Sequence, residues 1–318
     1  MTDLNEYWNA LRKSYGLYGA EKYRELIDFI KEEIDKYPGF RSGLYYPQMC
    51  AAVKLENHDL SLELFKEVID EGGWYSEMIL QQTPEFQPLQ GMPEFKRLSR
   101  ISVERFKEES MKNHDLTVFP DKSSGPFPLM LALHADGGLM KEEYAVWKGI
   151  VDHGYVLGMP RSTYVHWSRD GANWSGHQSA VDQVKAYVDK LLVDGSIDPK
   201  KTVLGGLSSG GGLAVKLSLT GAVPARGFVV VAPGGPETRE PEKWLPLIDQ
   251  AKNRDLQGII IRGGKDTAIP RENIQQLVEM LNDGGISCIF REYPEIGHWY
   301  PSDFMDVVTS FTNELDNG

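Results

Sequence analysis

One short run of small residues in the sequence has the types and spacing that nucleophilic chemistry requires. Gly206-Leu207-Ser208-Ser209-Gly210 fits the pattern G-x-S-x-G; an apolar run, 202–207, leads into it and a helical pattern follows it. Small residues on both sides of a serine permit a sharp strand-to-helix turn that holds the hydroxyl at the end of the strand. A helix that begins there favours developing negative charge. Ser208 is therefore the candidate nucleophile.

A serine hydroxyl needs a base, and the base needs a carboxylate that orients it. After Ser208 the sequence contains a single histidine, His298, which lies between a β-type run and the last helical pattern. Between these two residues, an apolar run at 258–262 is followed by Gly263-Gly264-Lys265-Asp266. The run predicts a strand that delivers Asp266 at its end. The chain order serine, aspartate, histidine is the one expected for a serine in this kind of turn.

Each of these three residues also has an ordinary structural interpretation. Ser208 could belong to a glycine-rich turn, Asp266 could cap a helix that begins near residue 270, and His298 could be a buried core histidine. Asp255 and Asp283 are weaker rivals to Asp266, because the first precedes its strand and the second ends a helix. The three residue types in this order favour the catalytic interpretation over the separate structural ones.

The second part of the chain has the pattern of a sheet that could position these side chains. Its β-type runs are 129–133, 155–157, 202–207, 227–232, 258–262 and 287–293, and its amphipathic stretches are 141–152, 178–193, 211–220, 271–283 and 302–315. Apolar runs separated by helices are typical of a mainly parallel sheet with helices on both faces. Ligands of such sheets bind beyond the carboxyl ends of the strands. The candidate serine and aspartate are predicted to lie at that edge.

The first part of the chain has helical periodicity and no good strand. Apolar residues recur at steps of three and four in three stretches between residues 21 and 106, which predicts amphipathic helices. Asp59 is the predicted N-cap of the second of them. We therefore expect a small all-helical domain over 1–112 and a catalytic domain over 113–318. No residues of the helical part form a chemical constellation.

The second part of the sequence resembles the α/β-hydrolase superfamily, and within it the esterases of the carboxylesterase and phospholipase type. The resemblance covers roughly residues 116–315, and its carriers are 206–211, 263–266 and 297–298. It implies an α/β-hydrolase fold and a Ser208–His298–Asp266 triad that cleaves a small-molecule ester through an acyl-enzyme. No metal or organic cofactor is implied. Residues 45–98 resemble a degenerate tetratricopeptide-type helical pair.

The same family places an oxyanion-hole segment, normally His-Gly-Gly-Gly or His-Gly-x-Gly, after an early strand. Here His134-Ala135-Asp136-Gly137-Gly138 stands at that position, with alanine in place of the first glycine. By position, we expect the backbone N–H groups of Asp136 and Ser209 to hold the oxyanion. The pair His134 and Asp136 also looks like part of a metal site, but two ligands without a third make a poor zinc site. The glycine run at 205–212 lacks the Lys-Ser/Thr of a phosphate loop.

Three tryptophans are candidates for substrate binding. Trp167 and Trp174 lie in a long polar segment after the run at 155–159, at the edge where substrate is expected, and Trp299 follows the candidate base. The alternative for the long segment is a loop that packs on the helical domain. For Trp299 both interpretations, substrate contact and packing, also stay open.

Composition and charge narrow the class of protein. The 318 residues are 41% hydrophobic and 25% charged, close to the average of globular proteins, and the formal net charge is −12. A protein that neutralises phosphates needs a basic surface, so nucleic acid is an unexpected partner. No apolar run approaches the ~18–20 residues of a membrane helix, and no signal-peptide pattern is visible. With only Cys50 and Cys288, far apart in sequence, we expect reduced thiols and a cytoplasmic protein.

Two other functions remain open at this level. A peptidase or amidase of the same fold would use the same triad, because a triad does not reveal its leaving group. A helical-repeat interaction protein with a non-catalytic hydrolase-like domain is the second alternative. The N-terminal helices could also support a homodimer or a protein partner. The sequence does not identify the acyl and leaving groups of the substrate.

Overall fold

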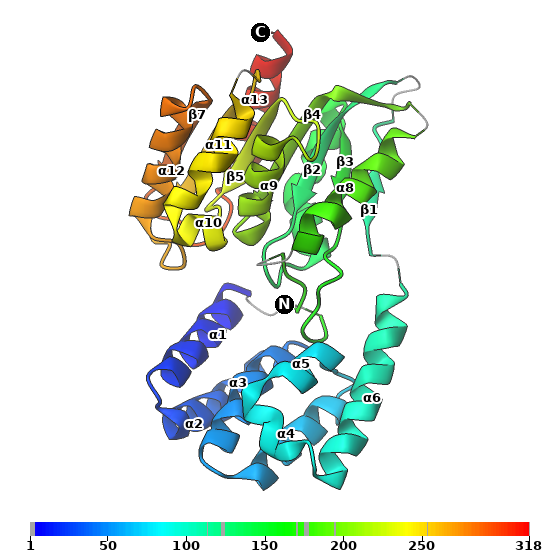
Figure 1. Ribbon diagram of the computed structural model, residues 1–318, viewed down its shortest axis with the longest axis vertical. Helices are drawn as coiled ribbons and strands as arrows, with labels where there is room; N and C mark the ends of the chain where they lie inside the picture. The colour runs from blue at the N-terminus through cyan, green and yellow to red at the C-terminus, as the bar shows by residue number, and fades with distance from the viewer. Residues whose placement is uncertain are drawn as a thin grey trace. The chain divides into compact units, whose positions relative to one another are not determined.

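The computed structural model describes residues 4–112, 114–121, 125–169, 171–174, 178–193, 195–252 and 254–317. The chain divides into two compact units (Figure 1). The first comprises 1–113 together with 163–172, and the second comprises 114–162 and 173–318. The domain boundary expected between residues 112 and 113 stays a prediction, and the first compact unit ends its main stretch at residue 113. The segment 163–172, which follows the start of the predicted catalytic domain in sequence, packs within the first unit.

The first unit is helical. Its α-helices are α1 (Leu4–Gly19), α2 (Tyr23–Glu33), α3 (Arg41–Lys54), α4 (His58–Asp70), α5 (Glu77–Gln82) and α6 (Pro93–Ser110), with 3₁₀ turns at Ile34–Lys36 and Pro84–Leu89. Between Ser42 and Val53, every side chain of α3 except that of Tyr46 is buried. A helix that is buried all round has no amphipathic stripe, so periodicity did not reveal α3.

The start of α4 corrects one prediction. Asn57, and not Asp59, is the N-cap, because the Asn57 side chain accepts a hydrogen bond from the N–H of Leu60 at 3.1 Å. Asp59 lies in the first turn of the helix. A carboxylate there interacts favourably with the helix dipole without capping the helix. Both residue types are common at N-caps, so the sequence did not distinguish them, and the prediction of Asp59 is wrong.

The second unit is a seven-stranded sheet in the order β1-β3-β2-β4-β5-β6-β7. The strands are β1 (Leu116–Val118), β2 (Phe127–Leu133), β3 (Val156–Met159), β4 (Ile197–Leu207), β5 (Gly227–Val231), β6 (Gln257–Gly263) and β7 (Ser287–Tyr293). All neighbouring pairs are parallel except β1 with β3. The predicted mainly parallel sheet is confirmed, and the short antiparallel edge strand β1 was not expected.

Helices cover both faces of this sheet (Figure 1). They are α7 (Met140–Trp147), α8 (Gln178–Leu192), α9 (Ser209–Thr220), α10 (Pro236–Arg239), α11 (Leu245–Ala251), α12 (Arg271–Asp283) and α13 (Phe304–Asn317), with 3₁₀ turns at Lys148–His153 and Pro241–Trp244. Buried residues of α8, α9, α11 and α12 belong to the core on one face, and those of α7 and α13 to the core on the other.

Strand β2 shows why the apolar runs are continuous. Leu129, Leu131 and Leu133 lie in the first of these cores, whereas Met130 and Ala132 lie in the second. Successive side chains of a strand point to opposite faces, so a strand covered on both sides needs apolar residues at every position. This central placement brings the end of β2 beside the end of β4, where the candidate nucleophile follows.

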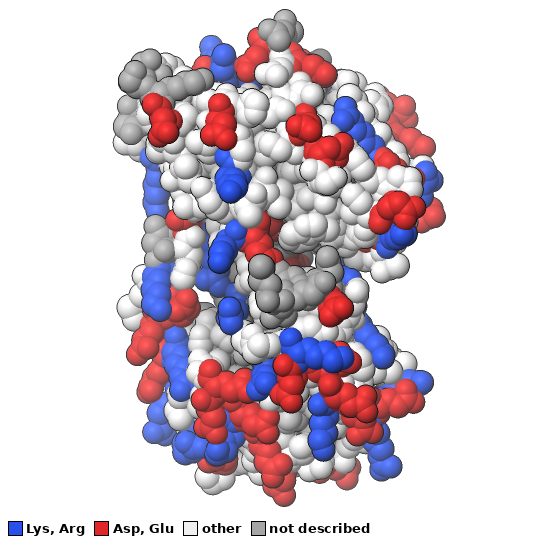
Figure 2. All heavy atoms as spheres, turned by 180° about the vertical axis from the view of Figure 1, so that it is seen from behind, with Lys and Arg blue, Asp and Glu red and all other residues white. Residues whose placement is uncertain are grey.

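The surface carries charges of both signs. On the face shown in Figure 2, acidic and basic side chains are interspersed, most densely over the helical unit. Among the residues that the structure describes, no helix combines the length and apolar character that crossing a bilayer requires. Cys50 and Cys288 are both buried and form no disulfide with each other.

Candidate active site

Ser208 occupies the sharp turn between β4 and α9. Its φ of 55° and ψ of −123° place a non-glycine residue in a conformation that costs free energy. Three backbone hydrogen bonds hold it there: its N–H donates to Val231 O at 2.9 Å, and its carbonyl accepts from Gly212 at 2.9 Å and Gly234 at 2.7 Å. The turn was predicted from G-x-S-x-G, and its backbone has the strained conformation that the pattern implies.

The glycines around Ser208 allow backbone segments to approach closely. A Cβ atom at Gly206 or Gly210 would lie 2.6 or 2.2 Å from the carbonyl oxygen of Leu133, and one at Gly212 would lie 1.8 Å from that of Gly234. These distances are far below contact distance, and the obstacles are backbone atoms. The small residues are therefore required so that the turn can pack against the end of β2 and the segment after β5.

Asp266 and His298 form a hydrogen-bonded pair. The distance from Asp266 Oδ2 to His298 Nδ1 is 2.7 Å, and the Asp266 side chain is fully buried. Its Oδ1 accepts the N–H groups of Ala268 at 2.7 Å and Ile269 at 3.2 Å. Burial alone would raise the pKa of Asp266, but the hydrogen bonds from His298 and these amides lower it below the usual value. An ionised Asp266 accepts a hydrogen bond from the N–H at Nδ1, which leaves the unprotonated Nε2 of His298 available as a base.

The acid and base segments follow the neighbouring strands β6 and β7. The N–H of Gly264 donates to Tyr293 O at 2.7 Å, and that of Lys265 donates to Ile296 O at 2.9 Å. These bonds join the two segments just before the acid and the base. Because β4 and β6 are both parallel strands of one sheet, Ser208 and Asp266 lie at the same edge.

Arg262 is a site residue that the sequence analysis missed. Its side chain is buried, and its guanidinium donates to the carbonyl oxygens of Asp266 at 2.8 Å and Gly263 at 2.9 Å. It also forms an ion pair with Glu292 at 3.1 Å. The sequence feature that could have revealed it is the position of Arg262 at the end of the otherwise apolar strand β6. Arg262 fixes the backbone of the segment that carries the acid.

Ser208 lines a cavity of about 100 Å³ at this edge. The lining residues are Asp136, Ser208, Ser209, Gly234, Gly235, Thr238, Arg239, Ala268, Ile269, Pro270 and Asn273. Within the described ranges, the Ser208 hydroxyl and the His298 ring form no hydrogen bond with each other. In proteins without bound substrate, such catalytic hydrogen bonds are often long. The structure therefore pairs the candidate acid Asp266 with the candidate base His298 and places Ser208 separately on the cavity wall.

The two expected oxyanion donors belong to residues that are joined by their side chains. Asp136 Oδ1 accepts the hydroxyl of Ser209 at 2.5 Å and the N–H of Trp174 at 2.9 Å. Ser209 is the first residue of α9, where a backbone N–H has no partner within the helix. These contacts bring the loop after β2 against the start of α9, next to Ser208.

His134 holds the same loop from its other side. The N–H of Ser162 donates to Nε2 at 3.1 Å, so Nδ1 carries the proton and donates to Ala135 O at 2.7 Å. Burial lowers the pKa of His134 to about 4. Since a peptide unit is planar and trans, fixing the Ala135 carbonyl also fixes the direction of the Asp136 N–H. Both ring nitrogens are engaged, so the metal-ligand interpretation of His134 does not fit.

Glu143, a second buried residue that the sequence analysis missed, also contacts this loop. Its Oε1 accepts the N–H of Ala135 at 3.2 Å, and its Oε2 accepts the hydroxyl of Tyr300 at 2.7 Å. The Tyr300 oxygen in turn accepts the indole N–H of Trp147 at 3.2 Å. Burial raises the pKa of Glu143 to about 7. The carboxyl thereby links the loop after β2 to the segment that carries the base.

The three predicted substrate-binding tryptophans are placed in different surroundings. Trp167 is in the helical unit, where its ring stacks on Tyr46 at 5.6 Å. Trp174 is buried beside His134, with ring centroids 4.9 Å apart, and Trp299 makes an edge contact with Tyr300 at 5.4 Å. None of the three is among the described residues that line the cavity at Ser208.

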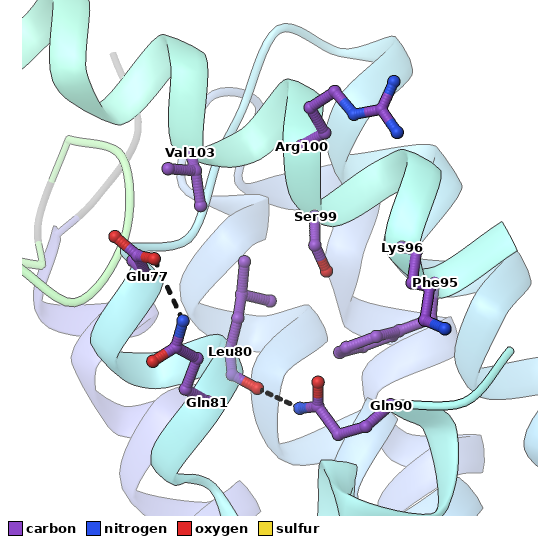
Figure 3. Close-up of a pocket in the computed structure, with 9 residues that line it drawn as sticks. All are labelled: Glu77, Leu80, Gln81, Gln90, Phe95, Lys96, Ser99, Arg100 and Val103. Atoms are coloured by element: carbon purple, nitrogen blue, oxygen red, sulfur yellow. Dashed lines mark hydrogen bonds between the residues drawn. The ribbon is translucent and has the colours of Figure 1, made fainter. Parts of the chain in front are cut away.

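A second cavity, of about 280 Å³, lies in the helical unit between α5 and α6. Figure 3 shows Leu80, Ser99 and Val103 pointing into it, with Gln90 bonded to the Leu80 carbonyl. Among the described residues that line this second cavity, the serine, Ser99, forms no hydrogen bond with a side chain that could act as a base. Within the same ranges, no group of three or more His, Cys, Asp or Glu side chains could hold a metal ion.

Comparison with known families divides the chain much as the structure does. Residues 6–110 match a family described as the N-terminal domain of A/B hydrolase-like proteins, and residues 163–315 match the Phospholipase/Carboxylesterase family. The helical part of the chain is thus similar to the N-terminal domain of hydrolase-like proteins. The tetratricopeptide-type resemblance of residues 45–98 stays a prediction.

Individual relatives are distant but consistent with these matches. A Yersinia pestis protein named as a carboxymethylenebutenolidase is 26% identical over 199 residues, which are 58% of this chain and 73% of that protein. A crystal structure of an uncharacterized Bacillus cereus protein covers 98% of this chain and 99% of its own, with a TM-score of 0.56 and 23% identity. The esterase PE8 covers 64% of this chain and 99% of its own, with a TM-score of 0.54 and 18% identity. The two structural likenesses show the fold.

Proposed function

Because the chain belongs to the α/β-hydrolase superfamily, with a catalytic domain of the phospholipase/carboxylesterase type, we propose that it hydrolyses carboxylic esters with Ser208 as nucleophile. The observation that carries this proposal is the hydrogen bond between the buried Asp266 and His298, at the same sheet edge as the strained turn of Ser208. A nucleophilic serine requires a base of this kind and a carboxylate that orients it.

In the proposed reaction, Nε2 of His298 takes the proton of the Ser208 hydroxyl as its Oγ attacks the ester carbonyl carbon. Asp266 holds the ring and stabilises the imidazolium. The backbone N–H groups of Asp136 and Ser209 bind the oxyanion. The carbon–oxygen bond to the leaving alcohol then breaks, and His298 protonates that alcohol. Water, deprotonated by His298, attacks the acyl-enzyme; the bond from the acyl carbon to Ser208 Oγ breaks, His298 returns the proton to Oγ, and the acid is released.

Substrate hydrolysis by the wild type and by Ser208→Ala tests this proposal. We expect hydrolysis of p-nitrophenyl acetate and butyrate, with kcat lowered by at least about 10³-fold in Ser208→Ala. Ser218→Ala is a matched control, because Ser218 lies in α9, the helix that follows Ser208, and its hydroxyl donates to Ala214 O at 2.9 Å, away from the cavity. Retained activity in Ser208→Ala would place the nucleophile elsewhere.

Aminoacyl p-nitroanilides distinguish ester from amide cleavage. Esters have the better leaving group, and we expect kcat/KM to be higher for the butyrate ester than for any of the anilides. Faster cleavage of an anilide would contradict the esterase assignment and favour a peptidase or amidase with the same site.

A further inference from the structure

We propose that the cavity at Ser208 selects esters that carry a carboxylate, and that Arg239 is the cation that binds this group. The inference deepens the proposed function and rests on it, since it names the substrate class of the same site. Arg239 is the last residue of α10 and lines the cavity together with Ser208. It is the sole basic side chain among the described lining residues.

The acidic neighbours of Arg239 along the chain are engaged by other cations. Glu237 Oε1 lies 2.8 Å from the ammonium of Lys216, and Glu240 Oε1 lies 2.7 Å from that of Lys243. Within the described part of the chain, no carboxylate forms a salt bridge with Arg239. Its five N–H donors form a planar fork that matches two carboxylate oxygens. The guanidinium is therefore available to a ligand at the mouth of the cavity.

The backbone that carries Arg239 is fixed from the side of α12. The side-chain amide of Asn273 donates to the carbonyl oxygen of Thr238 at 2.8 Å, and both residues line the cavity. Thr238 itself is buried. This hydrogen bond ties α10 to the start of α12, next to the segment that carries the acid. The arginine thus extends from a held turn, although its own side chain is exposed.

The size of the cavity limits the substrate. About 100 Å³ is well below the ~300–1,000 Å³ of pockets that enclose drug-sized ligands. A long acyl chain does not fit into this space, whereas a short group that ends in a charge does. A carboxylate at the mouth keeps part of its hydration and gains the charge-assisted bond to Arg239.

The charge of the ligand is limited by Asp136, the acidic side chain in the same wall. Two donors, the Ser209 hydroxyl and the Trp174 amide, bind its Oδ1. A single arginine suits a singly charged carboxylate better than a phosphate, which carries nearly two charges at pH 7.

Matched ester pairs test the inference. The first pair, mono-p-nitrophenyl glutarate and its methyl ester, differs in charge on the acyl side. The second pair, 4-acetoxybenzoate and its methyl ester, differs in charge on the leaving side. We expect the wild type to prefer the charged member of at least one pair by about tenfold in kcat/KM. Rates measured with Ser208→Ala provide the background, which includes intramolecular attack by the free carboxylate.

Arg239→Gln should abolish this preference, and Arg239→Lys should retain part of it because the charge remains and the fork is lost. Lys252→Gln is the matched control: it removes one positive charge from an exposed residue that does not line the cavity and whose partner is Asp249, so the pairs of Glu237 and Glu240 stay intact. We expect the control to keep the wild-type preference. Added salt should weaken the preference of the wild type.

A wild type that prefers the neutral ester in both pairs would overturn the inference. So would a preference that persists unchanged in Arg239→Gln or that disappears equally in Lys252→Gln. Failure of the proposed function looks different, because then neither member of either pair is hydrolysed faster than in Ser208→Ala. That result would overturn both proposals together.

Discussion

At the residue scale, two buried titratable side chains hold the loop after β2 and respond to pH in opposite directions. The pKa of His134 is lowered by burial to about 4 from an ordinary 6.5. The pKa of Glu143 is raised by burial to about 7 from an ordinary 4.5. Both side chains hydrogen-bond to the backbone of Ala135. Their protonation states therefore bear on the segment that is expected to donate to the oxyanion.

Whether each residue makes the free energy of unfolding rise or fall with pH depends on whether the folded or the unfolded chain binds more protons at that residue. Between pH 4.5 and 7, folded Glu143 holds a proton that the unfolded chain has released, so its contribution to the free energy of unfolding falls as the pH rises. Between pH 4 and 6.5, unfolded His134 is protonated and the folded residue is not. The contribution of His134 therefore rises with pH. In the wild type these two slopes partly cancel.

Glu143→Gln should remove one of the two slopes. We expect the free energy of unfolding of this variant to rise more steeply between pH 5 and 7 than that of the wild type, by on the order of 2 kcal/mol. Urea unfolding at pH 5, 6 and 7 measures the difference. Glu314→Gln, a change at an exposed residue of α13, is the control and should run parallel to the wild type. A Glu143→Gln profile parallel to the wild type would contradict the assignment.

At the scale of elements, the acid segment after β6 depends on one buried arginine. Arg262 donates to the carbonyl oxygens of Asp266 and Gly263 and pairs with Glu292. Arg271 pairs with the same Glu292 at 3.0 Å, but it is exposed, and within the described residues its hydrogen bonds go to that carboxylate alone. The two arginines thus share Glu292 as a partner, but only Arg262 also donates hydrogen bonds to the backbone of the segment that carries Asp266.

Arg262→Met should lower the free energy of unfolding by about 2–4 kcal/mol, because it leaves buried carbonyl oxygens without a donor. It should also lower kcat by about tenfold or more, since Asp266 then no longer holds His298 in one orientation. Arg271→Met should change stability by less than about 1 kcal/mol, as exposed ion pairs do. Equal losses in both variants would show that Glu292, and not the acid segment, is the important partner of Arg262.

At the scale of the whole molecule, the chain passes between the two units near residues 113, 162 and 172. The segment 163–172 contributes to the helical unit. The N–H of Ser76 donates to His166 O at 2.8 Å, that of Ser168 donates to Trp74 O at 2.9 Å, and Trp167 stacks on Tyr46. The helical unit is therefore assembled from two parts of the sequence, and removing residues 1–112 would expose the aromatic side of this segment.

Trp167→Ala should loosen the helical unit selectively. We expect faster amide hydrogen exchange in α3 and around Trp74, with the central strands β4 and β5 still protected. Trp174→Ala is the matched contrast, because Trp174 packs beside His134 in the second unit; its effect should appear around β2 and the following loop. Faster exchange in the central strands of the Trp167 variant would contradict this division.

The sequence was informative where a local pattern decides the structure. Continuous apolar runs identified most of the parallel strands, and the glycines around Ser208 identified the turn. The helix α3 and the edge strand β1 were missed, because the first is buried all round and the second has only three residues. Neither a helix that is buried all round nor a strand of three residues leaves a periodic signal.

Apart from Asp266 and His298, whose sequence context indicated their pairing, long-range partners could not be predicted from the sequence. Glu143 and Tyr300 bond to each other across most of the second unit's sequence, and Trp167 finds Tyr46 in another part of the chain. Nothing local distinguishes Glu143 from the glutamate before it. Such contacts become visible only when the packing of the whole molecule is known.

The central claim is that Ser208 forms a covalent bond to the substrate, and active-site labelling tests it most directly. After treatment with a fluorophosphonate, intact-mass analysis should show a single adduct on the folded wild-type chain, and peptide mapping should place it on Ser208. Ser208→Ala should remain unlabelled. An adduct on a different residue, or ester hydrolysis by a wild type that takes up no label, would contradict the account.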